Sequence, residues 1–336
     1  MALFDVDPHH PDSSLIHRAA EILRDGGLVA FPTETVYGLG ANALNADAVA
    51  RIFEAKARPA WNPVIAHVTS VHDARALTTA WPALATVLAQ TFWPGPLTLV
   101  LPKHESVPDI VSAGLPAVAI RIPRHPVARA LIAALGAPIA APSANRFTEL
   151  SPTTAAHVQE SLGDRISMIL NGGPCDVGIE STVVDLTGDV PILLRPGVIS
   201  REMLANATGV SISLAPDEAR DNTPRHSPGM VERHYAPRAD VWLFTGDDLH
   251  EMQQRITKVF PVESGRMSAL VLDWSLTFPE HVRVVRMPND PLAYARLLYA
   301  TLHDLDQDGF AVIAIERPPQ RGAWAGIHDR LNRAAH

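Results

Sequence analysis

Short apolar runs alternate with amphipathic stretches along most of this chain. Residues 13–25 (SSLIHRAAEILRD) place apolar side chains on one helical stripe, and Gly26-Gly27 follows them, so the pattern predicts a helix that ends there. A second helix is expected after Asn45 or Asp47 as its cap, and a third at 127–135. Strands are expected at 28–31, 64–68, 97–101, 118–122, 139–142, 168–170, 182–186 and 192–194. Strands that alternate with helices are typical of an α/β sheet covered by helices.

The pattern breaks near Ala215. Residues 215–240 (APDEARDNTPRHSPGMVERHYAPRAD) are polar, contain prolines and lack periodicity, which predicts a linker. Apolar runs resume at 241–244, 269–272, 282–285 and 311–315, with a helix expected at 291–302. We therefore expect an α/β domain at residues 1–208, an interdomain linker at 209–239 and a smaller α/β domain at 240–336.

The composition is that of a globular protein, because 47% of the 336 residues are hydrophobic and 19% are charged. No apolar stretch approaches the roughly 20 residues that a membrane-spanning helix requires. The first residues carry Asp5, Asp7 and Asp12 rather than the apolar core of an export signal. The single cysteine, Cys175, excludes an internal disulfide framework and a zinc site built from several cysteines. These features favour the cytoplasm.

The net charge and the absence of several common motifs argue against some classes of function for this protein. The formal net charge of −8 argues against a uniformly basic surface that coats nucleic acid, although a local basic patch is compatible with it. Neither standard phosphate-binding loop, G-x-x-x-x-G-K-[ST] or G-x-G-x-x-G, is present. The 15 histidines form neither H-x-x-x-H nor H-E-x-x-H, so no metal site is expected, and no serine lies in G-x-S-x-G. A nucleotide site in this chain has to be built in another way.

The segment PTETVYGLG, from Pro32 to Gly40, directly follows an expected strand. A turn would need only the proline and one glycine, because these residues supply a fixed φ and access to positive φ. The additional threonines, glutamate and tyrosine therefore indicate a role beyond turning the chain. We expect this segment to form one wall of a ligand site.

Further polar residues stand at the ends of the expected strands or in adjoining loops. Ligands of open α/β sheets bind outside strand ends, so these residues are candidates for one binding cleft. They are Thr33, Glu34, Thr35, Tyr37, Lys56, Arg58, Asn62, His67, Arg121, Ser143, Asn145, Arg146, Ser151, Ser181, Thr182 and Arg195. Lys56 and Arg58 fit equally well as cations at a helix C-terminus, and His67 as a core histidine. Arg121, between two isoleucines of a strand, requires either an open sheet face or an anion.

Nine segments occur together and in a fixed order. They are PTETVYGLG, KARPxxNP, VIAHV, FWPGPLTLVL, AVAIRIPRHP, APSAN, SPTT, GIESTVVDL and ILLRPG. In order and spacing, this set resembles the YrdC family. With SPGMVERHYAP in the linker and a small α/β domain after it, the chain resembles the long, two-domain L-threonylcarbamoyl-AMP synthases. The resemblance implies a twisted open mixed sheet with helices, followed by a smaller Rossmann-like α/β domain.

The resemblance also implies a reaction and its residues. L-threonine, bicarbonate and ATP would give threonylcarbamoyl-AMP and pyrophosphate, with Mg²⁺ accompanying ATP and a tRNA threonylcarbamoyl-transfer machinery, or tRNA in weak contact, as partner. The implied catalytic residues are Lys56, Arg58 and Arg121. The implied L-threonine site contains Thr35, His67, Arg121, Ala141 and Ser181. The implied ATP site contains Lys56, Arg58, Asn62, Ala117, Ser143, Asn145, Ser151, Arg195 and Tyr235. Residues 216–239 are expected to close over the site as a lid.

Two residues depart from the motifs usual in this family. Ala57, in KARP, and Thr148, after SANRF, stand where a glycine is common; if those glycines have positive φ, the loop differs locally in this chain. Two other functions remain open. An RNA-binding module of YrdC type is weakened by the acidic net charge, and carbamoyl transfer in hydrogenase maturation by the single cysteine, because those relatives carry cysteine-rich zinc modules.

Overall fold

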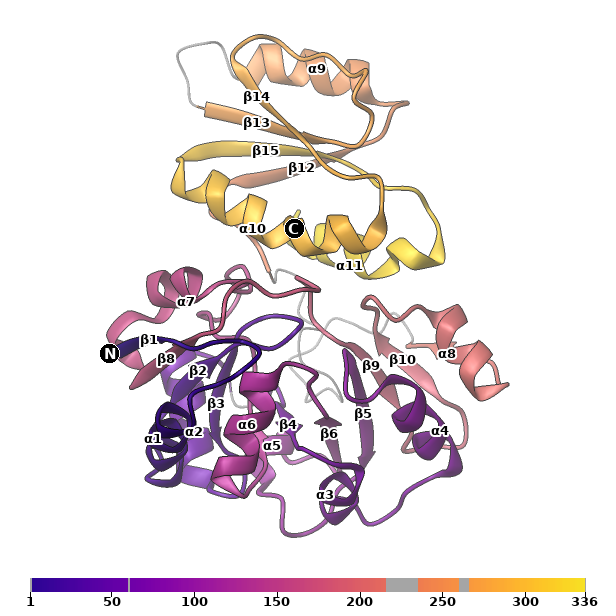
Figure 1. The fold of residues 1–336 in the computed structure, drawn as a ribbon. Coiled ribbons are helices and arrows are strands. Elements are labelled where there is room, and N and C mark those ends of the chain that lie inside the picture. The colour runs from indigo at the N-terminus through magenta and orange to yellow at the C-terminus, as the bar shows by residue number, and fades with distance from the viewer. Residues whose placement is uncertain (1, 60, 216–234, 260–265, 336) are drawn as a thin grey trace.

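The computed structural model describes residues 2–59, 61–215, 235–259 and 266–335. It contains a larger body, which ends at residue 215, and a smaller body, which begins at residue 240. Figure 1 shows the smaller body above the larger one.

The strands of the larger body are β1 (Ala2–Asp5), β2 (Val29–Phe31), β3 (Gly38–Asn42), β4 (Ile65–His67), β5 (Leu97–Pro102), β6 (Ala117–Arg121), β7 (Ile139–Ala140), β8 (Met168–Asn171), β9 (Thr182–Asp185), β10 (Ile192–Arg195) and β11 (Ser213–Leu214). Those of the smaller body are β12 (Asp240–Phe244), β13 (Arg266–Val271), β14 (Val282–Arg286) and β15 (Phe310–Glu316).

The helices of the larger body are α1 (Ser13–Arg24), α2 (Ala46–Lys56), α3 (Val71–Ala76), α4 (Ala83–Phe92), α5 (Asp109–Ser112), α6 (Pro126–Leu135), α7 (Ala155–Leu162) and α8 (Arg201–Thr208), with a 3₁₀ turn at Gly163–Arg165. Those of the smaller body are α9 (Leu249–Val259), α10 (Pro291–Gln307) and α11 (Ala325–Ala334), with a 3₁₀ turn at Gly322–Trp324.

The larger body has one mixed sheet of eleven strands, in the order β1-β8-β2-β3-β7-β4-β6-β5-β9-β10-β11. The pairs β4·β6 and β5·β9 are parallel, whereas β2·β3 and β5·β6 are antiparallel. The smaller body has a parallel sheet in the order β12-β15-β13-β14. The expected fold class, a mixed α/β sheet followed by a second, smaller α/β unit, is confirmed.

Local sequence explains where several helices begin and end. Asp12 accepts hydrogen bonds from the backbone N–H groups of Ser14 and Leu15, which caps α1, and the apolar stripe of α1 is buried. Asn45 caps α2 in the same way, as expected. Proline is the first residue of both α6 and α10, where its missing N–H has no intrahelical partner to lose.

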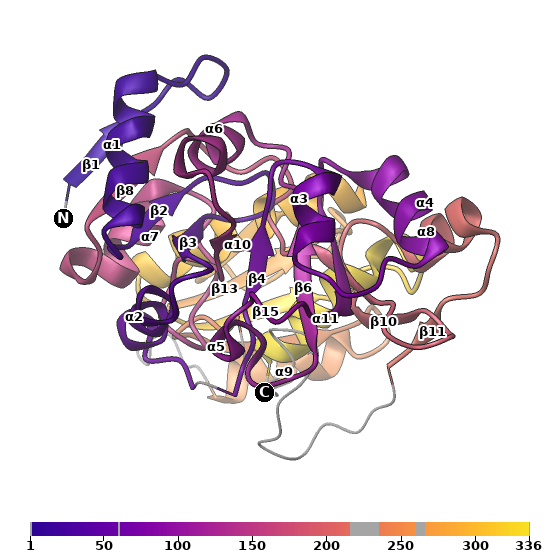
Figure 2. The same cartoon turned by 90° about the horizontal axis from the view of Figure 1, so that it is seen from below.

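The helices of the larger body pack against the large sheet in two groups. Apolar residues of α2, α4 and α7 join strand residues in the main hydrophobic core, and α1 and α6 pack over the β1, β2, β7 and β8 end. Figure 2, seen from below, shows α1 and α2 toward one end of the sheet and α4 and α8 toward the other. A small apolar cluster of Ile65, Val100, Ala117, Ala119 and Val183 lies on the opposite face of the central strands from the main core.

The two bodies share a hydrophobic cluster. In the smaller body α9 covers one face of the sheet, and α10 and α11 lie between the other face and the larger body (Figure 1). Tyr294, Leu298 and Tyr299 of α10 belong to the same buried cluster as Val36 and Leu150 of the larger body. Fully burying one such leucine stabilises by roughly 1.5–3 kcal/mol, so this contact fixes the smaller body against the larger one.

The glycines of the PTETVYGLG segment have a packing role. No strand was expected there, but Gly38 to Asn42 form strand β3, antiparallel to β2. A Cβ at Gly40 would lie 2.8 Å from Phe31 Cε1 and 2.9 Å from Ile139 Cγ2. Glycine is therefore needed for close packing in a strand, which periodicity does not reveal.

The expected linker contains ordered structure at both ends. Strand β11 lies within residues 209–239 and pairs with β10, so it belongs to the large sheet. Ala236 forms a bridge with Glu149 of the larger body. The lid expectation for residues 216–239 falls largely on residues 216–234, which lie outside the described residues.

Among the described helices, none combines the length and the apolar character that a membrane crossing needs.

Candidate active site

One face of the large sheet carries three of the expected site residues, His67, Arg121 and Ser181, at neighbouring strand ends. Side chains alternate between the two faces of a strand, so residues two apart share a face. His67, Thr98, Arg121 and Ser181 are each two residues from a member of the small apolar cluster and therefore lie on its face. The strand register places His67 directly beside Arg121.

Arg121 forms an ion pair with a carboxylate of the protein itself. Its Nη2 atom lies 2.8 Å from Glu34 Oε1, although their orientation does not make this contact a hydrogen bond. Nη1 donates to Thr35 Oγ1 at 2.9 Å, and Nε donates to the Gly95 carbonyl at 3.2 Å. Burial opposes the ionised form of Glu34, but Arg121 outweighs it and lowers the pKa of that carboxyl. An anion was one of the two explanations that the sequence offered for Arg121, and this anion is Glu34, a cleft candidate that had not been assigned to Arg121.

His67 is a neutral imidazole in this site. Burial, with Arg121 beside it, lowers its pKa to about 3. Its Nδ1 atom lies 3.2 Å from the Ile65 carbonyl. A neutral ring next to a guanidinium can accept or donate a hydrogen bond without adding charge.

Ser181 and Arg195 form a second group of buried polar contacts. Arg195 donates through Nε to the Ser181 carbonyl at 3.0 Å and through Nη2 to Ser181 Oγ at 3.1 Å. Ser181 Oγ also lies 2.7 Å from Thr98 Oγ1. This group adjoins the Arg121 group, because the Thr182 N–H donates to the Pro96 carbonyl and Arg121 bonds the adjacent Gly95.

Arg58 and Tyr235 adjoin Arg195. Arg58 donates to the carbonyls of Asn62 and Pro63 at 3.2 and 2.9 Å. Burial lowers its pKa to about 10; Tyr235 opposes this shift and Arg195 adds to it. The Asn62 side-chain nitrogen is buried with no hydrogen-bond partner, which is costly unless a ligand supplies one. The three arginines that were expected to converge thus lie in neighbouring contact groups.

Lys56 holds the loop that follows β7. Its ammonium donates to the Ser143 carbonyl at 2.5 Å and to the Asn145 carbonyl. Burial, with Arg58 nearby, lowers the pKa of Lys56 well below its ordinary value. The Asn145 side chain donates to two carbonyls, while its Oδ1 atom is buried without a partner. Lys56 thus acts on the backbone of Ser143 and Asn145 rather than projecting freely into solvent.

The two alanines among the expected residues lie in apolar surroundings. Ala117 belongs to the small apolar cluster and shares its face of β6 with Ala119 and Arg121. The Ala141 N–H donates to the Ile65 carbonyl at 3.0 Å, and its methyl group would be 3.2 Å from a Cβ at Gly38. Small side chains at these positions leave the backbone accessible to a neighbouring group.

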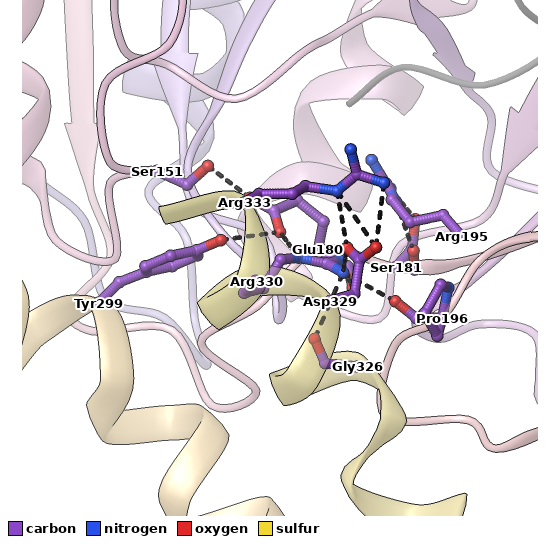
Figure 3. A network of polar contacts seen from close by, with 10 residues as sticks. All are labelled: Ser151, Glu180, Ser181, Arg195, Pro196, Tyr299, Gly326, Asp329, Arg330 and Arg333. Atoms are coloured by element: carbon purple, nitrogen blue, oxygen red, sulfur yellow. Dashed lines mark hydrogen bonds and ion pairs between the residues drawn. The ribbon is translucent and has the colours of Figure 1, made fainter. Parts of the chain in front are cut away.

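Ser151 belongs to a network that reaches into the smaller body. Its hydroxyl donates to Glu180 Oε1 at 2.5 Å, and Arg330 of α11 donates to Glu180 Oε2 at 2.7 Å (Figure 3). Tyr299 of α10 adds a hydrogen bond of 3.3 Å to the same oxygen. Burial opposes the ionised form of Glu180, but Arg330 and Arg195 lower its pKa.

Sequence reasoning missed Glu180 and Arg330, and it placed Glu34 among the cleft candidates without assigning it to Arg121. Both glutamates stand in quoted segments, PTETVYGLG and GIESTVVDL, and a buried acid beside expected arginines was the available signal. Arg330 gave no such signal, because its segment reads as an ordinary amphipathic helix with polar residues around it. Its burial depends on docking between two parts of the chain that are distant in sequence.

Known proteins match the chain along nearly its whole length. Residues 21–197 match the Sua5_yciO_yrdC family model, described as telomere recombination, and residues 199–336 match the model described as threonylcarbamoyl-AMP synthase, C-terminal domain. The chain belongs to the threonylcarbamoyl-AMP synthase family. The family member of Pyrococcus abyssi is 42% identical over 323 residues, which cover 95% of this chain and 94% of that relative. The one of Bacillus subtilis is 41% identical over 323 residues, 95% of this chain and 92% of that relative.

Solved structures of the family agree with the fold. The crystal structure of P. abyssi Sua5 complexed with L-threonine matches with a TM-score of 0.91 and 40% identity, over 100% of this chain and 98% of that chain. Escherichia coli YciO matches with a TM-score of 0.53 and 26% identity, over 59% of this chain and 97% of that chain. The two-domain form of the threonylcarbamoyl-AMP synthase family therefore describes this chain.

Proposed function

We infer that this chain is a threonylcarbamoyl-AMP synthase, which joins L-threonine, bicarbonate and ATP into threonylcarbamoyl-AMP and releases pyrophosphate. The observation that carries the inference is that three buried arginines, Arg58, Arg121 and Arg195, lie in adjoining groups of contacts that include buried hydroxyl groups. Burying positive charge is costly unless anions balance it. A carboxylate and a triphosphate are anions of the kind this site is suited to hold.

We propose that the Arg121 group forms the L-threonine site. Arg121 offers a planar guanidinium to the threonine carboxylate. Thr35 Oγ1 lies 2.9 Å from Arg121 Nη1 and so stands beside the same site. In this proposal Glu34 holds the guanidinium in place before the substrate binds. His67 and Ser181 would contact the polar groups of threonine, and Ala141 would leave room beside them.

We propose that the Arg58 and Arg195 groups form the ATP site. Arg58 and Arg195 would face phosphates, and the unpartnered Asn62 nitrogen and Asn145 Oδ1 would gain partners from the nucleotide. The remaining residues proposed for this site are Ala117, Ser143, Ser151 and Tyr235. Because the ammonium of Lys56 binds two loop carbonyls, we propose that it acts by positioning Ser143 and Asn145.

The proposed reaction follows from these positions. The threonine amine bonds to the carbon of bicarbonate and becomes a carbamate, while the hydroxide of bicarbonate leaves as water with a proton from the amine. A carbamate oxygen then attacks the α-phosphorus of ATP, the bond from that phosphorus to the bridging oxygen breaks, and pyrophosphate leaves. Arg58 and Arg195 would stabilise the charge that develops on the phosphates, while Arg121 holds the attacking group in line, so positioning and electrostatics supply the catalysis.

We propose that Mg²⁺ enters the site together with ATP. Mg²⁺ is usually bound through substrate phosphates and few protein ligands, and it neutralises charge on the leaving pyrophosphate when bound. The buried, unpartnered Asn145 Oδ1 atom is a neutral oxygen of the kind that can bind Mg²⁺, so Mg²⁺ entering with ATP would supply the partner that this atom lacks. Among the described residues, no three His, Cys, Asp or Glu side chains are grouped closely enough to hold a metal.

The chemistry of the product indicates what consumes it. Threonylcarbamoyl-AMP is a mixed anhydride and is prone to hydrolysis, so we propose direct hand-off to a tRNA threonylcarbamoyl-transfer machinery in the cytoplasm. Weak tRNA contact is compatible with this proposal. An RNA-binding module is less well supported as the main function, because the arginines that lie together here are buried rather than spread over a surface.

Pyrophosphate release by the purified full-length chain tests the proposed function. With ATP, Mg²⁺, bicarbonate and L-threonine, we expect release that falls to background when threonine or bicarbonate is omitted. Equal release without threonine would contradict the synthase. Salt-dependent tRNA binding without any threonine-dependent release would favour the RNA-binding alternative.

A further inference from the structure

Glu180 connects the proposed ATP site with the C-terminal body. Its Oε1 atom accepts from Ser151 of the larger body, and its Oε2 atom accepts from Arg330 and Tyr299 of the smaller body (Figure 3). The two oxygens of one carboxylate are therefore divided between the site and the C-terminal helices. A carboxylate held at both oxygens cannot rotate without breaking one of these contacts.

Arg330 is itself fixed on every side. It is 1% exposed, and besides Glu180 it donates to the carbonyl of Pro196 at 2.9 Å and to the carboxylate of Asp329 at 2.7 Å. Its guanidinium lies over the ring of Tyr235, 5.4 Å from the centroid. Arg330 therefore contacts both Tyr235 and the segment that follows Arg195.

Helix α11 approaches this segment as closely as a backbone allows. A Cβ at Gly326 would lie 2.8 Å from the Gly197 carbonyl carbon and oxygen, closer than such atoms can approach. Glycine at 326 is what lets the first turn of α11 reach the backbone of Gly197. This contact sets the distance from which Arg330 extends to Glu180.

We propose that Arg330 is a positioning residue for the nucleotide half of the active site. It fixes Glu180, which in turn orients the hydroxyl of Ser151, and it supports the ring of Tyr235. This assigns the C-terminal body a part in ATP binding, and it rests on the proposed function because Ser151 and Tyr235 are proposed ATP residues. Among the described residues, the contacts of Arg330 reach the threonine half only through the Glu180 carbonyl, which is joined to Ser181 and accepts from Nη2 at 3.3 Å. We therefore expect loss of Arg330 to weaken ATP binding more than threonine binding.

The test compares Arg330→Met with Leu331→Ala in the full-length chain. Leu331 is fully buried on the same helix and belongs to the hydrophobic cluster, and its side chain has no polar group to offer Glu180, so its truncation matches the loss of packing. Initial rates of pyrophosphate release are measured against ATP and against threonine, well below the melting temperature of each variant. We expect Arg330→Met to raise the KM for ATP about tenfold or more and to change the KM for threonine less than threefold. We expect Leu331→Ala to change neither KM by more than threefold.

Two further variants keep the test decisive if Arg330→Met folds poorly. Tyr299→Phe removes one hydrogen bond from Glu180 Oε2 and keeps the ring, so we expect a rise of about threefold in the KM for ATP alone. In Glu180→Gln/Arg330→Met, no buried charge of this pair remains and the amide oxygen can still accept from Ser151. We expect this double variant to recover most of the affinity for ATP.

The outcomes separate this proposal from the proposed function. Wild-type protein without threonine-dependent release contradicts the function itself. Threonine-dependent wild-type release, combined with equal rises of both KM values in Arg330→Met or with the same ATP effect in Leu331→Ala, overturns the role of Arg330. A Tyr299→Phe variant in which the KM for threonine rises instead of the KM for ATP overturns it as well.

Discussion

For Arg121, the sequence indicated that an anion could be needed, but it did not identify Glu34 as that anion. Its place between two isoleucines in a strand indicated a buried charge that requires an anion. The structure supplies Glu34 from the segment after β2, 2.8 Å away. The requirement followed from strand alternation, whereas the identity of the partner depends on how β2 and β6 lie in the sheet.

Ala57 and Thr148, the two departures from the family's glycines, both have positive φ. The values are 50° at Ala57, the C-cap of α2, and 74° at Thr148. A non-glycine residue in this region is strained by roughly 1–2 kcal/mol. The turns at these two positions are thus left-handed and strained in this chain.

Replacing these residues by glycine should stabilise the protein. We expect Thr148→Gly to raise the free energy of unfolding by about 1 kcal/mol and Ala57→Gly by about 0.5 kcal/mol, since the added freedom of the unfolded chain offsets part of the relief. Urea unfolding measures both. Ala113→Gly, at φ 54° on the C-cap of α5, is the matched control and should also stabilise. Destabilisation of about 1 kcal/mol in all three, as at ordinary helix positions, would contradict this account.

Among the elements, those that follow strong periodicity were predicted best. The strands at β2, β4, β5, β6, β8 and β9 and the helices at α1, α2, α6 and α10 were expected from apolar spacing and caps. Strand β3 was missed because glycines carry no apolar signal, and the short β1 and β11 because they depend on pairing with β8 and β10. Tertiary contacts, rather than local preference, form these strands.

Helices α7 and α10 meet through two stacked histidines. The rings of His157 and His303 lie 3.8 Å apart at an interplanar angle of 17°. Burial lowers the pKa of His157 to about 3 and that of His303 to about 4; His303 adds to the shift of His157, and Arg238 to that of His303. Glu160 acts in the opposite direction on His157. Both rings are therefore neutral in the folded protein.

This pair should make stability fall in acid. Unfolded histidines bind protons below pH about 6.5, while the folded pair does so only below about 4, so the free energy of unfolding decreases as pH falls through this window. We expect His157→Phe, which keeps a stacked ring, to reduce the loss of stability between pH 7.5 and 5 by about 2 kcal/mol. Urea unfolding at both values measures it. His72→Phe, at an exposed position on α3, should leave the loss unchanged, and an equal loss in wild type and His157→Phe would contradict the assignment.

At the scale of the whole molecule, the two bodies form one structure around the site. The shared hydrophobic cluster and the Arg330–Glu180 ion pair at 2.7 Å join α10 and α11 to the larger body. The sequence predicted two α/β units and the residues of several motifs, but not which surfaces of the units meet. The Arg330–Glu180 pair alone joins residues 150 positions apart, and local patterns contain no information about such contacts.

The central claim is that Arg121 and the arginines near it bind threonine next to ATP. The threonine dependence of pyrophosphate release in Arg121→Lys tests this claim most directly. Lysine keeps a positive charge beside Glu34 but lacks the planar fork that binds a carboxylate at two points. We predict that kcat/KM for threonine falls at least about 30-fold, which corresponds to a loss of about 2 kcal/mol, while the KM for ATP changes less than threefold. Arg124→Lys, at an exposed neighbouring position, should behave as wild type. Wild-type threonine dependence in Arg121→Lys would contradict the account.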